Sequence, residues 1–207
     1  MMGKVENAIV YIDWGAAQRI ATHSFRYRSR SEEQIAEEAI LSLDNKVSDY
    51  LRRVKSSSAV RVKLRIYNGW HQGKTKTSVR VAFERIEQRF LSEPVRHGEI
   101  SFDGEFGWGN QLLCGGPRAT VWDTLGRPMK SRAPTRNKEQ KMVDMCLGAD
   151  LLFATRLGMA EHNIVICDDD DIWPAIVTSI QWGGKTKLMR ITRQNKNSHL
   201  DTRSILV

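Results

Sequence analysis

The apolar positions of this chain fall into short continuous runs and into longer segments with helical spacing. The runs Ala8–Asp13 and Asn163–Cys167 are rich in β-branched residues, so we expect a buried strand at each. Residues 59–70 alternate between apolar and mostly basic side chains, which predicts a strand with one core face and one basic face, near an edge of the sheet. A last strand is expected over 187–193.

Four segments show apolar residues at steps of three and four, which is typical of amphipathic helices. The first begins after Ser31, a suitable N-cap with Gln34 as its capping-box partner, and extends to Val54. Glycines follow the last two segments, as is common at helix C-termini. The other three helices are expected over 77–91, 137–158 and 172–184.

Strands therefore alternate with helices along most of the chain. This order predicts an α/β fold with a doubly wound, mainly parallel sheet, and 207 residues fit a single domain over 1–207. Residues 92–135 are punctuated by glycine and proline and hold only short candidate strands, so we expect a loop-rich insertion there. Residues 193–207 are expected to form a basic tail.

The charge balance of the chain indicates which class of partner to expect. The chain carries 32 Lys and Arg against 24 Asp and Glu, a formal net charge of +8, with a pI near 9.6. This excess favours nucleic acid as a partner, with ordinary solubility charge as the alternative. No apolar run approaches the roughly 20 residues that span a membrane, and the first residues lack a signal-peptide pattern, so we expect no membrane partner.

The cysteines indicate the compartment. Cys114, Cys146 and Cys167 are far apart and form no C-x-x-C pair, which excludes a disulfide framework and a zinc site of that type. Cys146 and Cys167 lie in apolar runs, where we expect buried thiols. A reducing, cytoplasmic location fits this pattern.

Carboxylates stand at the ends of two predicted strands. Asp13 ends the first, and four consecutive aspartates, Asp168–Asp171, follow the later one. In a doubly wound sheet, ligands bind outside the carboxyl ends of the strands, where the strand order reverses. If the two strands are neighbours, these carboxylates meet in one crevice, and Asp144 on the preceding helix could join them.

Converging carboxylates offer hard oxygen ligands for Mg²⁺ or Mn²⁺. One or two such ions can activate a water molecule and stabilise the leaving oxygen when a phosphodiester is cleaved. The basic surface would collect the polyanion, and the acidic pocket would hold the cations. Alternatively, the aspartates only cap the following helix and complement its dipole, which accounts for one or two of the four but not for Asp13.

Other basic segments are candidates for nucleic-acid contacts. A Gly-x-x-x-Gly-Lys-Thr segment begins at Gly69, but a P-loop needs four residues between its glycines, which argues against a nucleotide-binding loop. We assign His71 and Lys74 to phosphate contacts at the rim of the pocket, with a solvated loop as the alternative. Two further stretches flank the carboxylates, one of them interleaving arginines with Phe25 and Tyr27, which suits single-stranded RNA. Their candidate contacts are Arg26, Arg28, Arg30, Arg132, Arg136 and Lys138.

Three blocks of the chain resemble NYN-domain proteins, a branch of the PIN-like ribonucleases that includes the LabA-like bacterial group. VYIDWGAA is similar to the family's first strand and D-x-x-N motif, and KEQKMVDMCLGADLL is similar to its K-x-x-D-x-x-x-x-x-D helix. IVICDDDDIWPAI is similar to its apolar strand followed by S-G-D-x-D-F-x-P. The order and spacing match over most of the chain, with poor coverage of 92–135. The resemblance implies a PIN-like (Rossmannoid) fold and a divalent-metal-dependent ribonuclease.

The resemblance also implies roles for individual residues. Asp150 lies about 120° around the helix from Asp144, away from the same ion, so it is a supporting residue. The other supporting residues are Lys141 and Asp168. The implied catalytic residues, which would also hold Mg²⁺ or Mn²⁺, are Asp13, Asp144, Asp169 and Asp171.

One position departs from the family pattern. The asparagine of D-x-x-N falls on Ala16, whose side chain neither donates nor accepts a hydrogen bond. Either this subfamily dispenses with the contact, or the protein is impaired, or the residue was changed deliberately.

We expect a nuclease with RNA as the favoured substrate, and the alternative is a non-catalytic RNA-binding or scaffold module with the same fold. The oligomeric state, including a homo-oligomer, is left open.

Overall fold

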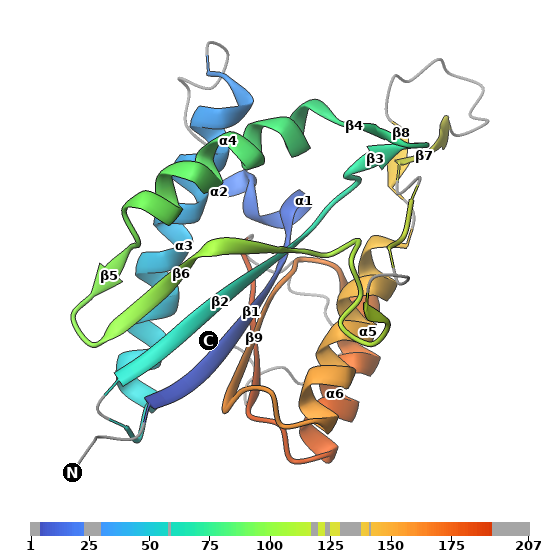
Figure 1. Ribbon diagram of the computed structural model, residues 1–207. Coiled ribbons are helices and arrows are strands. Elements are labelled where there is room, and N and C mark those ends of the chain that lie inside the picture. The colour runs from blue at the N-terminus through green and yellow to red at the C-terminus, as the bar shows by residue number, and fades with distance from the viewer. Residues whose placement is uncertain are drawn as a thin grey trace.

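A six-stranded sheet forms the centre of the molecule. The computed structural model describes residues 5–22, 30–57, 59–116, 120–122, 125–128, 138–140 and 142–191. The strand order is β10-β9-β1-β2-β6-β5 (Figure 1), and every neighbouring pair is parallel except β5 with β6. The strands are β1 Val5–Asp13, β2 Ala59–Tyr67, β5 Arg96–His97, β6 Ile100–Trp108, β9 His162–Ile166 and β10 Thr186–Met189.

Helices cover both faces of this sheet (Figure 1), which confirms the predicted doubly wound α/β fold. Helices α3 and α4 pack on one face, and α5 and α6 pack on the other. Their bounds are α3 Glu32–Val54, α4 Ser78–Ser92, α5 Val143–Arg156 and α6 Trp173–Gln181. Of the helices in the described part of the chain, none combines the length and the apolar character that a membrane span needs.

Short elements connect the main ones. The Gly-Lys-Thr segment lies in a small antiparallel ribbon, β3 with β4, whose turn contains Gly73 at φ +59, so it forms a hairpin and not a phosphate-binding loop. A second ribbon pairs β7 with β8. The short elements are α1 Trp14–Ala17, α2 Arg19–Thr22, β3 His71–Gln72, β4 Thr75–Lys76, β7 Leu125–Pro128, β8 Lys138–Gln140 and the 3₁₀ helix η3 Asp170–Ile172.

Alternation along β1 divides the core in two. Val10 and Ile12 pack with α3 and α4, whereas Ile9 and Tyr11 pack with α5 and α6. Because successive side chains of a strand point to opposite faces, Asp13 continues the phase of Ile9 and Tyr11. The last residue of β1 therefore presents its carboxylate on the α5 side of the sheet.

The helix starts follow local capping chemistry. The Ser31 Oγ accepts the Gln34 N–H at 3.2 Å and the Gln34 Oε1 accepts the Ser31 N–H at 3.0 Å, which confirms the predicted capping box. Helix α5 begins at Val143, later than predicted, because Met142 has φ 67, outside the right-handed helical region. Residues 138–140 instead form β8.

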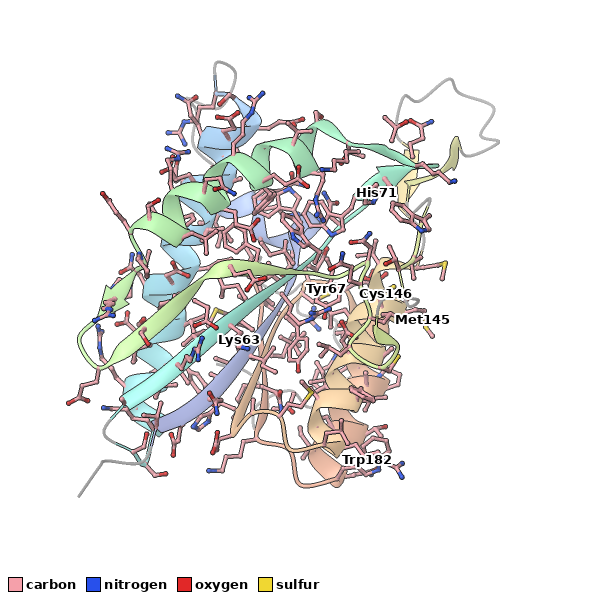
Figure 2. The ribbon with its side chains drawn as sticks, viewed as in Figure 1. Lys63, Tyr67, His71, Met145, Cys146 and Trp182 are labelled. Atoms are coloured by element: carbon pink, nitrogen blue, oxygen red, sulfur yellow. The ribbon has the colours of Figure 1, made fainter. Side chains whose placement is uncertain are left out.

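Strand β2 lies between β1 and β6, so the expectation that it lies near an edge of the sheet is wrong. Its basic side chains still reach solvent because α5 covers only the carboxyl end of this face. Lys63 lies on the uncovered part (Figure 2) and is exposed, whereas Arg65, nearer α5, is largely buried. An open face therefore does not distinguish a central strand from an edge strand.

The segment 92–135 also differs from the expectation. Its first part contains β6, which pairs in parallel with β2 and is a full member of the main sheet. Gly104 lies within it because a Cβ there would stand 2.3 Å from the Phe90 carbonyl oxygen of α4. Gly104 thus marks close helix packing, and residues 111–115 form turns with one isolated bridge at Gln111.

One charged group is buried on α3 without a described partner. Asp44 is 1% exposed, and its Oδ1 accepts no hydrogen bond from any residue that the structure describes. Burial away from water raises the pKa of Asp44 to about 8. The folded state is therefore destabilised progressively as the pH rises from the ordinary pKa of 3.8 to about 8, because the unfolded carboxyl ionises first.

We expect Asp44→Asn to stabilise the fold by about 1–3 kcal/mol at alkaline pH, because the amide removes a buried charge. The unfolded carboxyl ionises near its ordinary pKa of 3.8 and the folded one near 8, so the gain is absent below the first value and grows until the second. Urea unfolding across this pH range measures it. Asp49→Asn, exposed on the same helix, is the matched control and should stay within about 0.5 kcal/mol of the parent. A variant at position 44 that is destabilised at alkaline pH would contradict the prediction.

Candidate functional site

A polar cavity of about 540 Å³ opens at the carboxyl ends of β1 and β9. These strands are adjacent and parallel, with Ile12 beside Ile166. From them the chain proceeds to opposite sides of the sheet, so the cavity lies at the switch point where strand order reverses. Its lining residues are Asp13, Gly15, Arg19, Val143, Asp144, Asp168, Asp169 and Asp170.

Asp13 ends β1 and caps the short helix α1. Its Oδ1 accepts the Gly15 N–H at 2.9 Å, and its Oδ2 accepts the Ala16 N–H at 3.2 Å. Burial raises the pKa of Asp13 to about 6, and the negative charge of Asp144 adds to the rise while the amide donors oppose it. A carboxylate perturbed in this way within a cavity is typical of functional sites.

Asp144 reaches the same cavity from the first turn of α5. Burial raises the pKa of its carboxyl, and the negative charges of Asp169 and Asp171 raise it further. Carboxylates from three distant segments of the chain therefore repel one another here. A bound cation would offset this repulsion.

Asp168 and Asp170 are engaged by arginines. The Asp168 carboxylate accepts from Arg19 Nη1 at 2.9 Å and from the Ile191 N–H at 2.8 Å. Asp170 pairs with Arg190, which also donates to the Asp168 carbonyl at 2.8 Å. These two aspartates tie the segment after β9 to α2 and to the end of β10.

Asp169 and Asp171 are held differently. The Asp169 carboxylate caps η3 by accepting the Asp171 N–H at 3.0 Å. Neither side chain forms an ion pair with any residue that the structure describes. Asp171 does not line the polar cavity; it lies with Asp144 on the rim of a second cavity. Both carboxylates therefore keep their charge available to a cation.

The second cavity is a mostly apolar groove of about 560 Å³ between α5 and α6. Met145 stands outward from α5 at its edge (Figure 2) and is 75% exposed. At Gly148 the two helices approach so closely that a Cβ would lie 3.3 Å from the Ala175 side chain. The groove therefore places an apolar surface beside the carboxylates of Asp144 and Asp171.

Asp150 is fully buried and bonded away from the cavity. Its carboxylate accepts from Arg65 Nη2 at 2.6 Å, from the Tyr67 hydroxyl at 2.8 Å and from the Leu113 N–H at 2.7 Å. Tyr67 and Cys146 mark this contact region between β2 and α5 in Figure 2. Asp150 therefore joins β2, α5 and the loop after β6, in a structural role and not as a ligand in the cavity.

A divalent cation such as Mg²⁺ needs oxygen ligands gathered around one point. No group of three Asp, Glu, His or Cys side chains among the described residues is arranged to hold a metal ion by itself. The donors nevertheless fit a hydrated ion, because Mg²⁺ keeps several waters and often takes only one or two carboxylates. Hard oxygen donors without cationic partners match Mg²⁺ or Mn²⁺ better than a softer metal.

Three of the predicted nucleic-acid contacts can be located. Arg30 pairs with Glu38 of α3, and Lys74 is exposed in the turn between β3 and β4. His71 is only 5% exposed; its Nδ1 lies 3.3 Å from the Asn110 Nδ2, and burial lowers its pKa. The structure thus places His71 inside the fold, where it does not form an open rim.

The remaining predicted residues fall outside what the structure describes. For Lys138 the backbone in β8 is described but the side chain is not. The others outside the described residues are Arg26, Arg28, Arg132, Arg136 and Lys141.

Sequence reasoning missed Arg19, which lines the cavity beside the carboxylates. A single arginine a few positions after Asp13 carries no periodic signal. Only the turn from α1 into α2 brings its guanidinium to Asp168.

Comparison with protein-family models, with curated proteins and with solved structures found no match for this chain. The likeness to NYN-domain proteins therefore rests on the three sequence blocks alone.

We expect Asp144→Asn to lower the pKa of Asp13 from about 6 toward its ordinary value of 3.8, because one repelling charge is removed while burial persists. Carbon-13 NMR titration of the carboxyl groups without added metal measures it. Asp103→Asn, at a carboxylate paired with Arg61 elsewhere on the sheet, is the control. An unchanged Asp13 titration in Asp144→Asn would show that the two carboxylates do not interact.

We expect Asp150→Asn to destabilise the fold by about 3–5 kcal/mol, because it leaves Arg65 buried without its counter-charge. Asp144→Asn removes a repelling charge and should leave stability unchanged or raised. Chemical denaturation of both variants in one buffer measures the contrast. Equal losses would contradict the distinction between a structural and a cavity aspartate.

Proposed function

We propose that this protein is a divalent-metal-dependent nuclease that hydrolyses phosphodiester bonds, with RNA as the favoured substrate. The observation that carries the proposal is the convergence of Asp13, Asp144 and Asp169 from three distant segments on one polar cavity. Within the described part of the chain none of these carboxylates forms an ion pair, and burial, with added repulsion from Asp169 and Asp171, raises the pKa of Asp144. Such a cavity in a protein of net charge +8 suits metal-assisted chemistry on a polyanion.

The sequence blocks support the same assignment. The three blocks that resemble NYN-domain proteins contribute Asp13, Asp144 and the pair Asp169 and Asp171, respectively.

The proposal includes a cytoplasmic location. Free cysteines, which include the buried Cys146 and Cys167, accord with it.

The chain's own residues would prepare the site before the substrate binds. Asp13 is oriented by two amide donors and Asp169 by its cap on η3, so neither has to be reordered to hold an ion with Asp144 and Asp171. Mg²⁺ or Mn²⁺, when bound, supplies Lewis-acid activation of water and neutralises charge on the phosphate.

Two further features would position the strand. Arg19, whose guanidinium is held by Asp168, would contact a phosphate oxygen at the edge of the cavity. The apolar groove that shares Asp144 with the cavity would receive the adjacent base. Orientation of the phosphate between these contacts accounts for part of the expected rate enhancement.

A second candidate is a non-catalytic RNA-binding or scaffold module with this fold. Ala16 replaces the asparagine of the resembling family and is 1% exposed, so the contact that the asparagine side chain would make is lost. The lack of a three-ligand group among the described residues also favours this candidate. Such a module would bind RNA in a salt-dependent manner without turnover.

We expect the protein to cleave a mixed-sequence single-stranded RNA in Mg²⁺ or Mn²⁺ and to stop in EDTA. Asp169→Asn should slow cleavage by about 100-fold, because it removes a carboxylate from the cation site. Asp103→Asn, outside the cavity, is the control and should cleave at the parental rate. Gel electrophoresis of labelled RNA measures the rates, and circular dichroism verifies that the variants are folded.

Two outcomes would overturn this function. Robust cleavage by the chelated protein would exclude a metal-dependent reaction, and robust cleavage by Asp169→Asn would exclude the assigned site. RNA binding without turnover in either metal would favour the second candidate. A DNA strand of the same sequence tests the preference for RNA.

A further inference from the structure

A basic pocket of about 260 Å³ lies beside the acidic cavity, in addition to the apolar groove. It is formed by α2, by α3 and by the residues that follow β10. Arg19 lines both spaces, so the two are joined through one side chain. The residues that line the basic pocket are Arg19, Ile20, Lys46, Arg190 and Ile191.

Arg190 lines this pocket with a largely buried guanidinium group. Its side chain is only 10% exposed. One terminal nitrogen donates to the Asp168 carbonyl and the other pairs with Asp170, but the buried Nε has no partner among the residues that the structure describes. Buried donors are almost always satisfied in native proteins, because an unmet hydrogen bond costs free energy. The Arg190 guanidinium therefore keeps one donor that no described residue satisfies.

The charges around the pocket select the kind of acceptor. Arg19 is paired with Asp168 and Arg190 with Asp170, whereas the exposed Lys46 forms no ion pair within the described part of the chain. These five groups together carry one net positive charge. A singly charged anion with several oxygens matches them better than a metal ion does.

We infer that the basic pocket binds a phosphate of the nucleic-acid strand, next to the phosphate at the acidic cavity; this rests on the proposed function for the identity of the polymer. Guanidinium groups present fixed forks to phosphate oxygens, and Lys46 adds a point charge. The volume accommodates a phosphate with its waters, since a water takes about 30 Å³. Arg19 stands between the two positions and can contact either phosphate.

The four consecutive aspartates would then have two different roles. Asp169 and Asp171, together with Asp144, serve the cation site and the apolar groove. Asp168 and Asp170 hold the arginines that face the basic pocket, so they are positioning residues for a phosphate that they do not touch. A strand would then pass from the basic pocket across the acidic cavity to the groove.

The test measures RNA binding without cleavage. A labelled single-stranded RNA of mixed sequence is titrated with the full chain in EDTA, and fluorescence anisotropy gives the affinity at several salt concentrations. We expect Lys46→Ala to weaken binding about 3- to 10-fold at low salt and to reduce the slope of log affinity against log salt by about one. Lys63→Ala is the matched control, because Lys63 is an exposed lysine on the open face of β2 (Figure 2) and should bind as the parent does.

A second variant addresses the guanidinium. Arg190→Lys keeps the charge but loses the fork, so it should also weaken binding, and its melting temperature shows whether the fold survives. Lys46 is exposed, so Lys46→Ala should fold normally, and its result decides the test even if Arg190→Lys fails to fold. Inorganic phosphate, followed by phosphorus-31 NMR line broadening, is the second ligand.

The outcomes separate this inference from the nuclease proposal. Parental affinity in Lys46→Ala overturns the inference, even if the protein cleaves RNA. Binding that depends on Lys46 without any cleavage in Mn²⁺ supports the phosphate pocket and overturns the nuclease proposal. Phosphate binding at this pocket that RNA does not displace shows a site for the free anion, which overturns the inference.

Discussion

The parallel pairing of β1 with β9 is the constraint on which the candidate site depends. Residues Ala8–Ile12 lie in register with His162–Ile166, so both strands end at the same edge of the sheet. Asp13 and the aspartates after β9 meet only because of this register. A shift of one residue would turn Asp13 to the opposite face, since side chains alternate along a strand.

The aspartates at this edge of the sheet repel one another, and they differ in the groups that hold them. Backbone amides hold Asp13, arginines hold Asp168 and Asp170, and no described cation holds Asp169. The fold therefore neutralises part of the acidic cluster and leaves the rest unsatisfied. The unsatisfied part lies next to a basic pocket and an apolar groove. In the proposed function, the basic pocket would bind a phosphate, the acidic cavity a metal-bridged phosphate, and the groove a base.

Much of the fold could be predicted because each element leaves a local signal. Three short-range patterns lead to elements that appear where expected. They are the capping box at Ser31, the apolar run of β1 and the spacing of apolar residues by three and four in α3. The position of β2 in the sheet could not be predicted, because its open basic face depends on where α5 ends and not on its own alternation. Strand β6 was expected only as a short strand within an insertion, because Gly104 interrupts its apolar pattern; this glycine is required by the packing of α4, a contact between distant parts of the chain.

The candidate site divides along the same line. The sequence alone determined which carboxylates stand at strand ends, Asp13 and Asp168–Asp171, because strand ends are encoded by local runs of residues. It also placed Asp150 on a different side of its helix from Asp144. Only the tertiary structure decided that Asp150 pairs with Arg65, that the buried Nε of Arg190 has no partner among the described residues, and that His71 is buried. Ion pairing and burial depend on contacts between segments that are distant in the sequence, and only the folded sheet brings those segments together.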